Sequence, residues 1–100
     1  MTTTIFELRD FDNFQSYQLY ATLNGVATYF RNKSVKRFWM FGVDGKMYFD
    51  MDAEGLKQAM DYTKSYIGDN TRTSIRYSIE VMPGMVFDYQ YLLCDKTLND

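Results

Sequence analysis

The side chains best suited to chemistry in this chain are paired carboxylates and one thiol. Asp10 and Asp12, and likewise Asp50 and Asp52, stand two residues apart, a spacing that could bring two acids together for acid–base chemistry. Both pairs lie where a turn or a helix cap needs the same residue types, so the pattern favours a structural role. Cys94 ends an apolar run, and we expect it to be a small buried hydrophobe rather than a nucleophile.

The amino-acid counts narrow the chemistry further. The chain of 100 residues contains no His, which excludes histidine-dependent catalytic triads and the usual zinc sites. Its single Cys excludes an internal disulfide, and a free thiol suits a reducing compartment. No glycine-rich stretch ends in the Lys–Ser/Thr pair of a phosphate-binding loop. We therefore expect a protein that is not an enzyme, with no catalytic residues, no cofactor and no metal.

The segment 50–55 is similar to the first half of a calcium-binding loop. Acidic side chains occupy its first, third and fifth positions, a Gly occupies the sixth, and Asp61 falls at the twelfth. Lys57, however, stands at the eighth position, where an apolar residue usually anchors such a loop. The residues before this segment indicate a strand rather than a helix. A capped helix start explains the same acids, and we expect that structure instead of a calcium site.

Four cations lie within seven residues in the segment 31–37. They are Arg31, Lys33, Lys36 and Arg37, in a chain whose formal net charge is −2. Aromatic residues flank the segment on both sides, so it could hold phosphates while the rings stack on bases, or steer an acidic protein surface toward the molecule. A solvated loop whose long side chains reach into water explains the same residues.

Aromatic side chains make up 18% of the chain, with nine Tyr, eight Phe and one Trp. Such rings either fill a core or anchor a protein interface. Because rings fall on both faces of one predicted hairpin, we interpret the excess as a second contact surface. The residues expected to contact a partner are three aromatic anchors and four steering cations: Tyr20, Tyr29, Trp39, Arg31, Lys33, Lys36 and Arg37.

The first third of the chain predicts strands joined by turns. Residues 3–9 indicate a short strand, which the polar segment 10–13 ends. Asn24–Gly25 suits a two-residue type I′ turn, and matching residues on either side of it predict a hairpin over 16–32. A helix over 11–23 is the competing interpretation, because short apolar windows fit both periods.

The middle third predicts a hairpin and then a helix. Asp44–Gly45 is a turn signal between two aromatic strands, 38–41 and 47–49. Both faces of this pair are apolar, so we expect central strands that are covered on both sides. Asp52 as N-cap and a core-facing stripe of apolar residues predict one helix over 52–67.

The last third predicts a second long hairpin around a Pro-Gly turn. Its strands are 73–82 and 86–94. Apolar matching favours Ile79 opposite Tyr89 over the register of a tight turn, which predicts a three- or five-residue loop and a β-bulge. The polar tail 95–100 is expected to fray.

Together these elements predict an α+β fold. We expect an antiparallel, hairpin-rich β-sheet of about five to seven strands, with one helix (about 52–67) packed on one face. Residues 1–100 have room for a single small globular domain with one core. No apolar run approaches the roughly 20 residues that span a bilayer, and the first residues lack the pattern of a secretory signal. We therefore expect a cytoplasmic protein without membrane contact.

In composition alone, the chain resembles small accessory proteins encoded by bacteriophages, being short, acidic, rich in Tyr, Phe, Met and Asp, and poor in Ala and Pro. The resemblance implies a protein that binds and inhibits a host enzyme or defence complex in the host cytoplasm. We therefore predict a heterologous protein partner, with a homodimer as a further form. The alternative is a nucleic-acid-binding protein that uses the basic segment 31–37 and its flanking aromatics.

Overall fold

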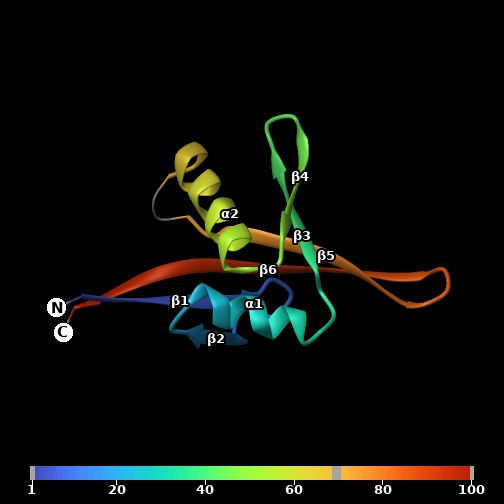
Figure 1. Ribbon diagram of the computed structural model, residues 1–100, viewed down its shortest axis with the longest axis horizontal. Helices are drawn as coiled ribbons and strands as arrows, with labels where there is room; N and C mark the ends of the chain where they lie inside the picture. Colours follow the sequence, from blue (N-terminus) through green and yellow to red (C-terminus); the bar gives the residue numbers. More distant parts are fainter. Residues whose placement is uncertain (1, 69–70, 100) are drawn as a thin grey trace.

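The computed structural model describes residues 2–68 and 71–99, and it shows one open antiparallel sheet with two helices (Figure 1). The order of the six strands across the sheet is β2-β1-β6-β5-β3-β4. The expected α+β class is confirmed, although the prediction of one helix was wrong. The elements along the chain are β1 (Thr2–Asp10), β2 (Tyr17–Tyr20), α1 (Leu23–Arg31), β3 (Arg37–Gly42), β4 (Gly45–Asp50), α2 (Ala53–Tyr66), β5 (Thr73–Met82) and β6 (Met85–Asn99).

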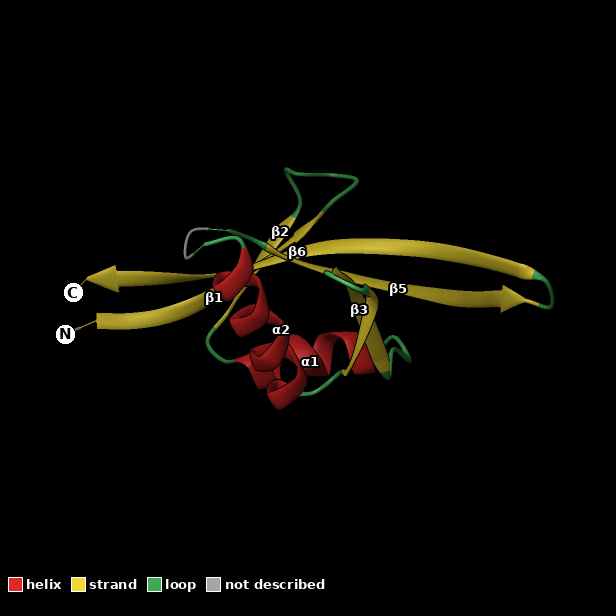
Figure 2. Cartoon of the chain, turned by 90° about the horizontal axis from the view of Figure 1, so that it is seen from above, coloured by secondary structure: helices red, strands yellow, loops and turns green. Residues whose placement is uncertain are grey.

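Both helices lie on the same side of the sheet (Figure 2). They contact each other and cover what we call the inner face, which carries Leu8, Ile75 and Leu93. Side chains alternate along a strand, so the neighbours of these residues point to the opposite, outer face. Glu7 and Arg76 lie there, and neither helix reaches that side of the sheet.

The hairpin predicted over 16–32 was wrong, because α1 occupies its second half. The side chain of Thr22 caps α1 by accepting a hydrogen bond from the Gly25 N–H at 3.1 Å. Val26, Ala27 and Phe30 form the buried stripe of the helix. The cap and this stripe outweigh the Asn-Gly turn signal, because the first turn of a helix tolerates both Asn and Gly. The competing helix over 11–23 was also wrong, since that range contains only a loop and β2.

The hairpin of β3 and β4 is confirmed, with Trp39 opposite Tyr48. Gly45 adopts a φ of +118°, which explains why the turn needs glycine. The expectation that both strands are central and covered on both sides was wrong, because β4 is the edge strand. On the outer face, Phe41 is 58% exposed and Tyr48 is 55% exposed.

Helix α2 follows the sequence prediction closely. Asp52 caps it and accepts a hydrogen bond from the Gly55 N–H at 2.7 Å. Gly55 is required by close packing, since a Cβ there would lie 2.0 Å from the Asp50 carbonyl oxygen. Leu56 and its stripe are buried, but Ile67, which we expected to face the core, is 68% exposed. The helix ends at the residue before it, so the helical period no longer applies there.

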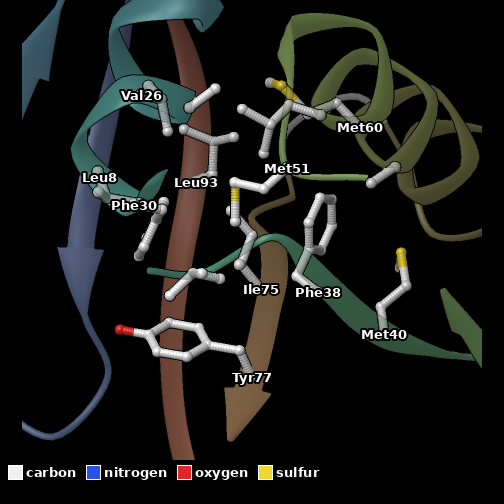
Figure 3. Packing of buried hydrophobic residues seen from close by; sticks show 14 residues of the cluster. Leu8, Val26, Phe30, Phe38, Met40, Met51, Met60, Ile75, Tyr77 and Leu93 are labelled. Atoms are coloured by element: carbon white, nitrogen blue, oxygen red, sulfur yellow. The ribbon is translucent and has the colours of Figure 1, made fainter. Parts of the chain in front are cut away.

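The core lies between the two helices and the inner face (Figure 3). Phe30 of α1, Phe38 of β3 and Leu93 of β6 are at most 1% exposed. Met51, in the connection between β4 and α2, fills the space between them. Burying one side chain of this size contributes about 1.5–3 kcal/mol. This packing fixes the inner face, so the candidate surfaces lie at its margins and on the outer face.

The hairpin of β5 and β6 has a two-residue turn at Pro83–Gly84, rather than the longer loop that we expected. The predicted β-bulge is confirmed, between Glu80 and Met82. The predicted pairing of Ile79 with Tyr89 was wrong, since Ile79 pairs with Phe87. The error is two residues, so each side chain was still assigned to its correct face.

The prediction of a frayed tail was wrong for the described residues up to 99. Strand β6 continues there and pairs with β1 from Asp10↔Tyr91 to Thr2↔Asn99. Backbone pairing with a neighbouring strand holds a polar segment that has no apolar pattern of its own.

Candidate functional site

The predicted basic segment runs from the end of α1 to the start of β3. Arg31 is the last residue of α1, Lys33 and Lys36 lie in the exposed connection, and Arg37 begins β3. Lys33 turns back to Tyr29 of α1, where its ammonium donates a hydrogen bond to the hydroxyl at 2.7 Å. Of the four cations, Lys33 is therefore the one that the structure ties to α1.

Arg37 and Trp39 lie together on the outer face. The Arg37 guanidinium lies 3.9 Å from the Asp50 carboxylate and 5.4 Å from the centre of the Tyr48 ring. The indole of Trp39 lies 4.2 Å from the Lys46 ammonium, measured to the ring centre. This strip therefore combines exposed rings with cations that already contact them.

Arg76 of β5 joins the same strip. Its guanidinium lies 5.5 Å from the ring of Trp39 and 5.0 Å from that of Phe41. Next to it, Phe11 and Asp12 help to line a shallow pocket of about 220 Å³. Sequence reasoning missed Arg76, because only the sheet order brings β5 beside β3.

Tyr20 and Tyr29 lie at the margin of the inner face. Their ring centres are 6.2 Å apart, and both side chains are half-buried against the core. Two other rings that flank the basic segment, Phe30 and Phe38, are fully buried and have no free face for a base. The roles that we predicted for Tyr20, Tyr29 and the basic segment stay predictions.

Glu7 on the outer face is the most strongly perturbed carboxylate that the structure describes. It is 1% exposed, and its oxygens lie 3.0 Å from Arg9, 2.6 Å from Lys96 and 3.6 Å from Arg72. The hydrogen bond from Arg9, which outweighs burial, and the charge of Lys96 lower the pKa of Glu7 to about 2. The cations come from β1, from β6 and from the residue before β5. We therefore assign this cluster the structural role of holding these strands together.

Cys94 stands opposite Glu7 in the pairing of β1 with β6. It is half-buried rather than fully buried as expected. Within residues 2–68 and 71–99, no group of three or more His, Cys, Asp or Glu residues is placed to hold a metal ion.

A polar pocket of about 270 Å³ lies beside Tyr29, Lys33 and Tyr91. The ring of Tyr91 is 6.5 Å from that of Tyr29 and is nearly parallel to that of Tyr77, at 6.2 Å. Its walls come from α1, from the end of β1, from the segment that leads into β2, and from β6. The remaining lining residues are Leu8, Asp10, Ser16, Tyr17 and Gln18.

Tyr29 and Tyr91 of this pocket differ in the acidity of their hydroxyl groups, and Tyr77 stacks beside Tyr91. Burial raises the pKa of Tyr77 to about 12 and moves the pKa of Tyr91 further in the same direction. Burial also disfavours ionisation of Tyr29, but the hydrogen bonds with Lys33 and Tyr91 outweigh it and lower the pKa of Tyr29. Tyr91 therefore remains a protonated donor at neutral pH.

The most prominent exposed feature is a two-stranded projection, which we call the arm (residues 78–88). Strand β5 pairs with β3 at Trp39↔Arg76, and the pairing of β6 with β1 starts at Asp10↔Tyr91. Between these positions and the turn, β5 and β6 pair only with each other among the described strands (Figures 1 and 2). Five large apolar side chains of the arm are 46–58% exposed: Val81, Met82, Met85, Val86 and Phe87. Sequence reasoning found this hairpin but not its projection, because that depends on where the neighbouring strands end.

A smaller apolar groove of about 210 Å³ lies between α2 and the β3–β4 hairpin. Phe41, Val43 and Ile67 are exposed along it. The Val43 N–H donates to the Tyr62 hydroxyl at 3.1 Å and ties the hairpin to the helix.

No protein-family model, curated protein or solved structure matches this chain. No helix in the described part of the chain is long and apolar enough to cross a membrane.

Proposed function

We propose that the protein is a non-enzymatic binding module that docks on a partner protein through the arm. The observation that carries this proposal is the exposure of five large apolar side chains on a projection that no other described element covers. Exposed apolar surface of this extent is unfavourable in water and is typical of a protein interface. The composition adds the second part of the proposal: docking inhibits a host enzyme or defence complex, as a bacteriophage accessory protein would.

The arm is built to enter a groove. Val86 and Phe87 are consecutive, so they point to opposite faces of the two-stranded arm. Met82 and Met85 flank the turn, and methionine adapts its shape to an irregular apolar surface. Burial of the exposed half of each of the five apolar side chains would contribute about 1 kcal/mol per residue.

The charge of the arm indicates the chemistry of the partner. Its charged residues are Glu80 and Asp88, and it contains no cation. We therefore propose that the partner presents an apolar groove with a basic rim. The unpaired backbone edges of the arm offer hydrogen bonds to a strand of the partner in addition.

The test is capture from a bacterial lysate by the immobilised full chain. We expect a stoichiometric protein to bind the native chain and to be lost with the double variant Met82→Ser and Met85→Ser. The matched control is Val43→Ser, which removes an exposed side chain from the tip of the other hairpin and should leave capture unchanged. Equal capture by the arm variant would contradict the proposal.

A parallel variant tests the outer face and the residues predicted there. If Trp39→Ala abolishes capture while the arm variant does not, the interface lies on the strip around Arg37 and Trp39. If neither variant affects a captured protein, both surfaces are excluded as its docking site. The melting temperature of each variant must match that of the native chain, so that loss of binding is not loss of folding.

Nucleic-acid binding by the segment 31–37 remains the alternative. The burial of Phe30 and Phe38 leaves few rings for stacking, so we expect no shift of single-stranded DNA or RNA in a gel at low salt. A shift that weakens steeply with salt and is lost in Lys36→Glu would support the alternative instead.

A further inference from the structure

We propose that the pocket beside Tyr29, Lys33 and Tyr91 binds a small hydroxylated carboxylate. The pocket lies at the margin of the inner face, between α1, the end of β1 and β6, and it shares no residue with the arm. This inference is therefore independent of the function proposed above. Its basis is the convergence of one cation, two hydroxyl groups and one carboxylate on a single cavity.

Lys33 supplies the cation for the carboxylate group. Its ammonium has three N–H donors, and the structure shows one of them directed to the Tyr29 hydroxyl at 2.7 Å. The same ammonium lies 4.4 Å from the centre of the Tyr29 ring, so the ring holds it beside the cavity. Lys33 also interacts with the Tyr91 hydroxyl, so one donor is left for a ligand oxygen, and a hydrogen bond to a charged partner is stronger than a neutral one.

The Tyr29 hydroxyl supplies a second donor. It accepts hydrogen bonds from Lys33 and from Tyr91, whose pKa is raised by burial, so its own O–H proton is left for a ligand. Ser16 and Gln18 line the same cavity and add polar atoms. An anion in this position therefore meets hydrogen-bond donors from Tyr29 of α1 and from Lys33 just after it.

Asp10 determines which anions fit. One of its oxygens accepts the Asp12 N–H at 2.9 Å, and the carboxylate lines the same cavity as Lys33. A second negative charge on the ligand would be repelled, so a singly charged carboxylate suits the site better than a doubly charged phosphate. The free acceptor capacity of Asp10 favours a ligand that carries a hydroxyl donor beside its carboxylate.

The size of the cavity, about 270 Å³, suits a small molecule such as a short hydroxy acid.

The test is an NMR titration of the full chain with three probes: glycolate, acetate and inorganic phosphate. We expect saturable shifts of the Tyr29, Lys33 and Tyr91 amides with glycolate, several-fold weaker binding of acetate, and the weakest binding of phosphate. Glycolate and acetate differ by one hydroxyl, so their ratio measures the contribution of Asp10. In Asp10→Asn this preference should fall, because the neutral amide is a weaker acceptor.

Lys33→Met preserves the length of the side chain and removes its charge. We expect it to weaken glycolate binding by about tenfold or more. The control is Lys57→Met, which removes a lysine on α2 that pairs with Asp61, and it should leave the affinity unchanged. Linear, non-saturating shifts with all probes, equal affinities for glycolate and acetate, or equal glycolate affinities of the native chain and Lys33→Met would overturn the proposal.

Discussion

Glu7 shows how one residue of the outer face holds several strands together. Its carboxylate is buried and contacts Arg9 of β1, Lys96 of β6 and Arg72 just before β5. In Glu7→Gln the three cations lose this partner, and Arg9, whose side chain is 19% exposed, is the least able to turn to water instead. We expect Glu7→Gln to lower the free energy of unfolding by about 3 kcal/mol, measured by urea denaturation at neutral pH. A change as small as that of Asp61→Asn, which breaks an exposed pair on α2, would contradict this role.

The same carboxylate predicts how stability depends on pH. Its pKa is lowered from 4.5 to about 2 in the folded chain, so the unfolded chain binds its proton first as the pH falls. The stabilisation is therefore fully present above pH 4.5 and is lost between pH 4.5 and pH 2. We expect the melting temperature of the native chain to fall more steeply in this window than that of Glu7→Gln. Parallel curves would contradict the prediction.

At the scale of the elements, α1 depends on its N-cap. Thr22 accepts the Gly25 N–H, and Thr22→Ala should lower the free energy of unfolding by about 1 kcal/mol. Thr28 in the same helix is a matched control, because its exposed hydroxyl donates to the Asn24 carbonyl and caps nothing. We expect Thr28→Ala to be neutral or slightly stabilising, since alanine has the higher helix propensity. Equal losses in the two variants, measured by urea denaturation, would contradict the assignment of the cap.

Helix α2 depends on a glycine for a different reason. A Cβ at Gly55 would lie 2.0 Å from the Asp50 carbonyl oxygen, and the backbone cannot give way without disturbing the cap at Asp52. We expect Gly55→Ala to lower the free energy of unfolding by about 3 kcal/mol. Gly25→Ala is the control, because the nearest atom to its Cβ, at 3.2 Å, belongs to the movable ring of Tyr20. A larger loss in the control would show that the contact at Gly55 relaxes.

The elements also show what can be predicted from this sequence. Helix α2 was predictable because its N-cap, its apolar stripe and its C-terminal residues all indicate a helix over nearly the same range. Helix α1 was not, because Asn24–Gly25 is a strong turn signal and the short segment fits either period. Local patterns specify hairpins, but the order of strands depends on contacts between distant segments. For this reason the hairpin of β5 and β6 was predicted, while the cations around Glu7 and the arm itself were missed.

At the scale of the whole molecule, the uneven cover of the sheet is the main feature. Both helices protect one face, and the longest hairpin extends beyond its neighbouring strands (Figure 2). Two arms from separate copies would bring four acids together, since each arm carries Glu80 and Asp88 without a cation. We therefore expect the purified chain to be a monomer in light scattering. A dimer that dissociates in the Met82→Ser, Met85→Ser variant would show instead that the arm binds a second copy.

Hydrogen exchange tests the role of the arm most directly. The backbone amides of residues 78–88 should be compared in the free chain and in the complex recovered from a lysate. Because no strand of the described chain pairs with the arm edges, the amides that face outward from the two arm strands should exchange quickly in the free chain and slow markedly on binding. The amides that are bonded between β5 and β6 are protected in both states. Residues of α2 should serve as an internal control and remain unchanged. Protection confined to the outer-face strip around Trp39, with an arm that exchanges as before, would contradict the account.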